Sequence, residues 1–201
     1  MPFTTPHKPY STDQGHSRGY LPHEHLHRLQ FITFRLHDSV PTELIEQWRK
    51  EKKSLAQQEE QKDTSRWIQL NQLIEEYADN GYGACYLKDE RIARLVIDAL
   101  KKNDEILYLL HCWCVMPNHV HVLIELLGES KVVDIVQQWR SYTAHEANKL
   151  LGRKGVFWMK DYYDRYIRDD KHYQVVRRYI DRNPTKAGLS EWQWSSHAEQ
   201  K

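Results

Sequence analysis

The chain has 201 residues, of which 40% are hydrophobic and 28% charged, with a formal net charge of +1. This balance is typical of a globular domain rather than a disordered chain, and no stretch approaches the roughly 18 apolar residues of a membrane span. The start of the chain lacks the basic-then-apolar pattern of a signal peptide, and three cysteines suggest no disulfide framework, so we expect a cytoplasmic protein with no membrane partner.

The first half of the chain predicts one strand and an added pair of helices. Residues 1–28 are polar and rich in His, Pro and Gly, which favours an extended arm. Residues 29–36 are rich in β-formers and predict the first strand. A charged helical pair over residues 41–80, with a break near residues 63–65, reads as an insertion, and residues 82–87 predict a short strand.

The second half predicts the core of the domain. Asp89 caps a helix with a buried face, residues 106–116 and 119–127 predict two strands joined by a Pro-Asn turn, and a helix covers residues 132–151. Residues 156–167 predict another strand, and a last helix runs from residue 169 to about Arg182, where Pro184 stops it. Strands mixed with helices favour a single α+β domain over residues 1–201, with helices packed on an antiparallel sheet.

Basic and aromatic residues gather near the end of the chain. From Arg153 to Lys186 there are ten Lys and Arg against five Asp and Glu, interspersed with seven aromatic residues. Basic groups hold phosphates and aromatic faces stack on bases, so single-stranded nucleic acid is a candidate partner. An aromatic core strand beside a solvated basic helix is the structural alternative, and composition alone leaves both open.

Two histidines separated by one residue are the strongest chemical signal. On a strand, alternate side chains share a face, so His119 and His121 point the same way while Val120 points into the core. Neutral imidazole is a good ligand for a divalent metal. A bare His-x-His is more often a pair of core histidines, so the hypothesis that this pair binds a metal ion requires further ligands.

The last helix offers those ligands. Tyr179 and Asn183 are four residues apart and therefore lie on one helix face. The Asn183 carbonyl oxygen can be a hard ligand, and the Tyr179 phenol can attack phosphorus once something takes its proton, a group that the sequence does not identify. Basic residues around the pair are candidates for DNA contact: Arg168, Arg177, Arg178, Arg182 and Lys186.

These motifs resemble those of the single-tyrosine HUH transposases, most of all the REP-associated tyrosine transposases. The resemblance rests on residues 116–123 (MPNHVHVL), 157–158 (FW), 161–163 (DYY), 166–169 (YIRD) and 179–188 (YIDRNPTKAG). It spans about residues 29–189. The His-x-His triplet is weak by itself, whereas both motifs in this order are specific.

The resemblance implies a fold, a chemistry and a set of roles. The fold is a ferredoxin-like antiparallel sheet with a C-terminal catalytic helix. Tyr179 is the implied nucleophile, and His119, His121 and Asn183 are the implied ligands of Mg²⁺ or Mn²⁺. Family members cleave and rejoin single-stranded DNA through a 5′-phosphotyrosine, which here implies palindromic repeat hairpins as targets. Monomer and homodimer are both open.

Other residues of the chain are alternative candidates for the metal ligands or the nucleophile. A second triplet, His25-Leu26-His27, sits in the polar arm without a following apolar run, so we do not assign it as the catalytic pair. A zinc site using Cys112 and Cys114 has an unusual spacing for zinc, and either residue can be a small buried hydrophobe. Three further tyrosines in the predicted strand have packing as their default role: Tyr162, Tyr163 and Tyr166. Glu125 shares the histidine face but is left out of the metal set, and Trp139 is expected in the core.

The sequence supports two hypotheses about function, and a third differs from both in what it predicts. The first is a metal-dependent DNA strand transferase that uses Tyr179. The alternative is a catalytically silent protein that binds DNA hairpins through its basic, aromatic surface. A zinc-dependent hydrolase would instead hold zinc tightly and form no covalent bond to DNA.

Overall fold

The computed structural model describes residues 29–57, 65–189 and 191–199, and the predicted N-terminal arm lies outside them. Its elements in chain order are β1 (Leu29–Arg35), α1 (Thr42–Gln57), α2 (Ser65–Asp79), the 3-10 helix η1 (Tyr86–Lys88), α3 (Glu90–Lys101), β2 (Tyr108–Val115), β3 (His119–Leu126), α4 (Val132–Leu150), β4 (Tyr163–Tyr166), α5 (Asp170–Lys186) and α6 (Ser196–Glu199). The α+β class predicted from the sequence is confirmed.

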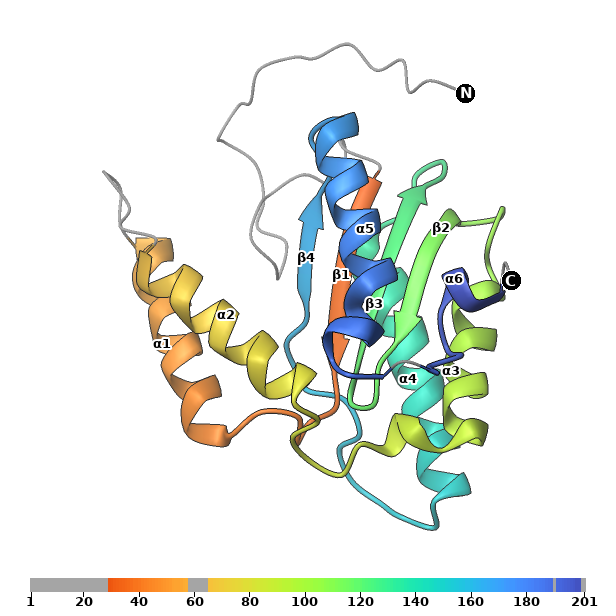
Figure 1. Ribbon diagram of the computed structural model, residues 1–201, viewed down its shortest axis with the longest axis horizontal. Helices are drawn as coiled ribbons and strands as arrows, with labels where there is room; N and C mark the ends of the chain where they lie inside the picture. The colour runs from red at the N-terminus through yellow and green to blue at the C-terminus, as the bar shows by residue number, and fades with distance from the viewer. Residues whose placement is uncertain (1–28, 58–64, 190, 200–201) are drawn as a thin grey trace.

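The four strands form one sheet in the order β2-β3-β1-β4, and all neighbouring strands are antiparallel. With a helix between β1 and β2 and another between β3 and β4, this is the ferredoxin-like arrangement. Figure 1 shows α5 lying across one face of the sheet, α3 and α4 behind the other face, and the α1–α2 pair beyond the β4 edge. The strand with the two histidines is therefore central.

The face toward α3 and α4 is apolar. Val120, Val122 and Ile124 of β3 are fully buried there. They pack with Ile32 and Phe34 of β1 and with residues of both helices in the largest core cluster. Full burial of one such side chain contributes about 1.5–3 kcal/mol, so this layer is the main source of stability for the sheet.

The opposite face is covered by α5. Val176 and Ile180 of this helix pack with Cys112, Cys114 and Leu123 of the sheet in a separate buried cluster. Asp169 caps the start of α5 by accepting a hydrogen bond from the His172 backbone N–H at 2.7 Å. The cap and the apolar stripe together fix which residues of α5 face the sheet.

The α1–α2 pair has its own small core. Val40, Leu44, Ile45 and Trp48 pack with residues of α2 and with Met159. The described part of this pair lies between β1 and η1 in the chain. It is additional to the helices that pack on the two faces of the sheet. Its position beside β4 and β1 directs the end of α2 toward the polar face of the sheet (Figure 1).

Two predicted elements were wrong in type or extent, and one short helix was not predicted. Residues 82–87 form no strand, because Gly81, Gly83 and Cys85 have φ values of 71°, 88° and 51°, which turn the chain into η1. The strand predicted over residues 156–167 is reduced to β4 and a single bridge between Leu36 and Trp158. The short helix α6 was not predicted.

The last helix does not end near Arg182, as we predicted, but continues through Pro184 to Lys186. Proline removes one backbone donor, and this loss falls near the end of the helix. Gly188, with a φ of 74°, then terminates the helix, while the Leu189 N–H donates to the Pro184 carbonyl at 2.8 Å. The extension keeps Asn183 inside regular helix.

Within the described ranges, no helix is both long enough and apolar enough to cross a membrane.

Candidate active site

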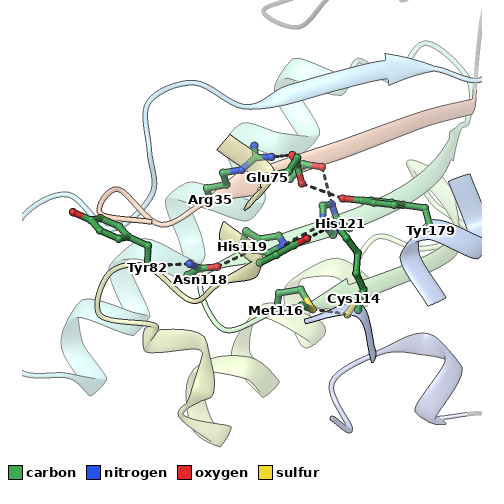
Figure 2. Close-up of polar contacts among 12 residues, drawn as sticks. Arg35, Glu75, Tyr82, Cys114, Met116, Asn118, His119, His121 and Tyr179 are labelled. Carbon is green, nitrogen blue, oxygen red and sulfur yellow. Dashed lines mark hydrogen bonds and ion pairs between the residues drawn. The ribbon is translucent and has the colours of Figure 1, made fainter. Parts of the chain in front are cut away.

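The two histidines of β3 lie side by side on the polar face of the sheet. His119 and His121 are both fully buried, and their Nε2 atoms are 3.0 Å apart. The pairing register places Arg35 opposite His119 and Thr33 opposite His121. The period-2 alternation of β3 therefore puts both imidazoles on one face, as we predicted for a strand, and the structure shows that this is the face covered by α5 (Figure 2).

Hydrogen bonds set the orientation of each ring. The Nδ2 group of Asn118 donates to the Tyr82 carbonyl at 2.8 Å, so its Oδ1 faces His119. That oxygen lies 2.8 Å from Nδ1 of His119, which must therefore donate. The Nε2 atom of His119 is left as an acceptor. Nδ1 of His121 lies 2.8 Å from the Thr33 hydroxyl, which can act as donor or acceptor.

Both imidazoles are neutral. Burial lowers the pKa of His119 well below its usual value, and the Arg35 and Lys186 charges lower it further. Burial also lowers the pKa of His121, with smaller effects of His119 and Arg35. A neutral imidazole with a free lone pair is the form that binds a metal ion.

The spacing of the two Nε2 atoms fits a shared divalent cation. Two nitrogens that each lie about 2.1 Å from one ion, at a right angle, are about 3.0 Å apart. The Asn183 side chain is buried, and its amide lies close enough to Tyr179 to lower the pKa of the phenol, while its carbonyl oxygen has no hydrogen-bond partner among the described residues. A buried carbonyl oxygen without a partner costs about 1–3 kcal/mol, and a cation would satisfy it. The residues present therefore fit such an ion.

Helix α5 brings Tyr179 to the imidazole pair. The ring of Tyr179 packs edge-on against His121, with 5.2 Å between centroids, and also against Phe31 at 5.9 Å. Burial raises the pKa of Tyr179 to about 12. The phenol is therefore protonated at neutral pH, and a group that removes its proton is required before it can act as a nucleophile.

Two carboxylates of α2 and one arginine of β1 also reach the site, and none of them was predicted from the sequence. Tyr179 donates a hydrogen bond from Oη to Oε2 of Glu75 at 3.0 Å, and Glu75 is also paired with Arg35. Oδ1 of Asp79 lies 3.9 Å from Nε2 of His119. Glu75 and Asp79 are four residues apart on a helix, so they share a face, and that acidic pair is the signal that sequence reasoning overlooked.

The predicted DNA-binding residues fall in three places. Arg177, Arg178 and Arg182 are exposed on the outer side of α5, where they line a groove of about 760 Å³ with residues near the end of the chain, including Trp192. Arg168 is exposed just before α5. Lys186 differs, because its Nζ pairs with Oδ2 of Asp79 at 2.6 Å, beside the histidines.

The cysteines do not extend the site. Cys112 and Cys114 are buried in the apolar cluster under α5, and burial raises the pKa of Cys112 to about 12 and that of Cys114 still higher. Such thiols stay protonated, whereas zinc binds thiolate. Across the described ranges, no cluster of three or more His, Cys, Asp or Glu side chains forms a metal site.

The rival tyrosines and the other candidates have structural partners. Tyr162 and Trp139 belong to the main core cluster, and Tyr166 is also buried. Tyr163 packs edge-on against Phe31. Oε2 of Glu125 lies 3.3 Å from Nε2 of His111, so this carboxylate is engaged away from the imidazole pair. The second triplet, His25 to His27, lies outside the described residues.

Comparison with known proteins supports one family. Residues 87–183 match the family described as "Transposase IS200 like". An uncharacterized protein of Haemophilus influenzae is 23% identical, with the alignment covering 50% of this chain and 76% of its own.

One solved structure shows a similar fold. The structure of a REP-associated tyrosine transposase bound to a REP hairpin is 17% identical and covers 90% of this chain and 82% of its own, with a TM-score of 0.52. At this identity the likeness concerns the fold alone. A candidate transposase from Deinococcus radiodurans R1 is 13% identical over 85% of this chain and 98% of its own, with a TM-score of 0.32.

Proposed function

Residues 87–183 of this chain match the IS200-like transposase family, and from that match we propose that the chain is a transposase that cleaves and rejoins single-stranded DNA with Tyr179 as the nucleophile. The observation that carries the proposal is the meeting of three groups from two elements. The Tyr179 ring contacts His121, whose Nε2 atom lies 3.0 Å from that of His119.

His119, His121 and Asn183 would hold a divalent cation, with Mg²⁺ or Mn²⁺ as the proposed ion. Bound there, the cation supplies charge stabilisation to a phosphate oxygen at the scissile bond. The remaining roles belong to the chain. Asn118 and Thr33 orient the imidazoles, and the unpaired Oδ1 of Asp79 adds negative charge beside them.

The proposed reaction exchanges one phosphate ester for another. Oη of Tyr179 forms a bond to phosphorus, the bond from phosphorus to the 3′ oxygen breaks, and a 5′-phosphotyrosine and a free 3′ end result. Because the ester bond is exchanged rather than hydrolysed, a 3′-hydroxyl can attack the phosphotyrosine and rejoin the strand without an external energy source. Helix α5 holds the phenol against the sheet through both steps.

The proposed substrate is a palindromic hairpin of single-stranded DNA. A structural relative with the same fold was solved with a REP hairpin. In this chain, the groove lined by Arg177, Arg178 and Arg182 offers three cationic side chains and Trp192 on the exposed side of the nucleophile's helix. Guanidinium groups bind phosphates, and an indole can stack on a base.

The same groove supports one alternative, a silent hairpin-binding protein. The deciding experiment incubates a labelled single-stranded hairpin with the protein and Mn²⁺, then resolves covalent adducts under denaturing conditions. We expect an adduct with the wild type and none with Tyr179→Phe, which still binds the hairpin. Tyr163→Phe is the matched control, since Tyr163 also packs against Phe31. Binding without any adduct in the wild type would instead establish the silent protein.

A further inference from the structure

The hydroxyl group of Tyr179 is bonded to a helix that lies far from it in the sequence. Its Oη donates to Oε2 of Glu75 at 3.0 Å, across 104 residues. Glu75 lies in the last turns of α2, outside the residues that match the family. Figure 2 shows the Glu75 carboxylate between the Tyr179 phenol and the Arg35 guanidinium.

Arg35 fixes this carboxylate from the other side. Its guanidinium pairs with Oε1 of Glu75, so the two carboxylate oxygens have different partners. The Arg35 side chain is only 4% exposed, and burial lowers its pKa to about 10, so it stays charged at neutral pH. A buried cation is stable only beside a paired anion, and the Glu75 carboxylate is the partner of Arg35.

Asp79 and Asn183 also lie near the Tyr179 phenol, but the carboxylate to which the hydroxyl donates its hydrogen bond is that of Glu75. Nδ1 of His119 faces Asn118 and Nδ1 of His121 faces Thr33, while the two Nε2 atoms face each other. No ring nitrogen is therefore directed at the Tyr179 hydroxyl. Oε2 of Glu75 is already within hydrogen-bond distance of the proton that must leave, which is the geometric requirement for a general base.

We propose that Glu75 is a catalytic residue, the general base that accepts the Tyr179 proton as the bond from Oη to phosphorus forms. In cleavage, the O–H bond of Tyr179 breaks and its proton moves to Oε2 of Glu75, while the departing 3′ oxygen takes a proton from water. In rejoining, the attacking 3′-hydroxyl releases its proton to water, and Glu75 returns the proton to the phenol as the tyrosine leaves. The inference rests on the proposed function, because it assigns a base to that nucleophile.

The test measures the single-turnover rate of covalent adduct formation on the labelled hairpin with Mn²⁺. Glu75→Gln keeps a side-chain oxygen for the Tyr179 hydrogen bond but cannot take its proton. We expect the adduct rate to fall by about 10²–10⁴-fold with little change in hairpin affinity. Glu76→Gln is the matched control, because Glu76 is exposed on the same helix and the same charge is removed.

The dependence of the rate on pH gives a second readout. With no general base, only ionised phenol reacts, so the Glu75→Gln rate should rise about tenfold per pH unit through the neutral range, whereas the wild-type rate should be nearly flat there. The titratable and charged groups around Tyr179 come from four elements, namely Glu75 and Asp79 of α2, Arg35 of β1, His121 of β3 and Tyr163 of β4. The control variant should follow the wild type.

Each outcome has a distinct meaning. Glu75→Gln leaves Arg35 without its anion, so thermal melting must first show that the variant is folded. If the variant is not folded, the pH dependence of the wild-type adduct rate is the deciding measurement. A wild-type rate that rises tenfold per pH unit without a plateau would contradict the role of Glu75 as general base. A folded Glu75→Gln that reacts at the wild-type rate also overturns it, while loss of the adduct in Tyr179→Phe leaves the proposed function intact. A wild type that forms no adduct overturns both.

Discussion

The amide of Asn118 holds the ring of His119 from outside the strand that carries it. Its Oδ1 lies 2.8 Å from Nδ1 of His119, and its Nδ2 is held by the Tyr82 carbonyl at 2.8 Å. The chain reversal after α2 is thus connected to the imidazole through one buried side chain. This connection fixes which nitrogen of His119 presents a lone pair toward His121.

Replacing Asn118 with Ala should weaken both stability and metal binding. The substitution leaves the Tyr82 carbonyl and Nδ1 of His119 without their partner, which should lower the free energy of unfolding by about 1–3 kcal/mol. Loss of the ring orientation should weaken Mn²⁺ binding by about 10–100-fold. Urea denaturation and isothermal titration calorimetry measure the two effects. Gln137→Ala, an exposed position on α4, should change neither. Wild-type Mn²⁺ affinity in the Asn118 variant would refute this role.

Asp79 should strengthen cation binding through its charge. Its Oδ1 lies 3.9 Å from Nε2 of His119 and has no hydrogen-bond partner among the described residues. A carboxylate beside a nitrogen ligand attracts a divalent cation bound there, and Lys186, which pairs with the other oxygen of Asp79, offsets part of this attraction, so Asp79→Asn should weaken Mn²⁺ binding by about tenfold. Calorimetry with Asp98→Asn, an exposed site on α3, provides the comparison. Equal affinities in both variants would remove Asp79 from the site.

Acid should destabilise the metal-free protein through the two buried imidazoles. Their pKa values are lowered in the folded state, so below about pH 6.5 the unfolded chain binds protons that the folded chain does not. Stability should therefore be full above pH 6.5 and fall on acidification, by at most about 1.4 kcal/mol per pH unit for each histidine. Urea denaturation in EDTA from pH 7.5 to pH 5 measures the slope, which should be shallower in His121→Gln. An unchanged slope would show that His121 is not held neutral.

The arginines of the α5 groove should contribute electrostatic affinity for the hairpin. Each phosphate contact on single-stranded nucleic acid contributes about 0.7 to the slope of log affinity against log salt. Arg177→Gln with Arg178→Gln should therefore reduce that slope by up to about 1.4 and weaken binding at low salt. Fluorescence anisotropy over a salt series measures it, with Lys149→Gln on α4 as the exposed control. If both proteins show the wild-type slope, the DNA lies elsewhere.

The central part of the site could be predicted because its signals are local. The alternation of His119, Val120 and His121 is readable from strand periodicity, and the interval from Tyr179 to Asn183 is readable from helix periodicity. The structure brings Tyr179 against His121, although nothing in the spacing of the two motifs dictates that approach. The resemblance to a known family supplied that expectation.

The acidic part of the site was missed for a physical reason. Glu75 reaches Tyr179 across 104 residues, and such contacts depend on how the α1–α2 pair docks, which no local pattern reports. The sequence predicted a charged helical pair over residues 41–80, but no role was assigned to its acidic residues. The predicted end of α5 was wrong for a similar reason. The helix continues through Pro184 because it is terminated by the turn at Gly188, which lies beyond it in the chain.

The two-sided character of β3 has a consequence for how this gene can change. Val120 and Val122 support the fold on one side of the pleat, while His119 and His121 face α5 on the other. Deleting or adding a single codon within this strand would exchange the two sides for every residue beyond it, which buries imidazoles in the apolar layer and presents valines to the phosphate. Only an insertion or deletion of an even number of residues would keep each later side chain of the strand on its original face.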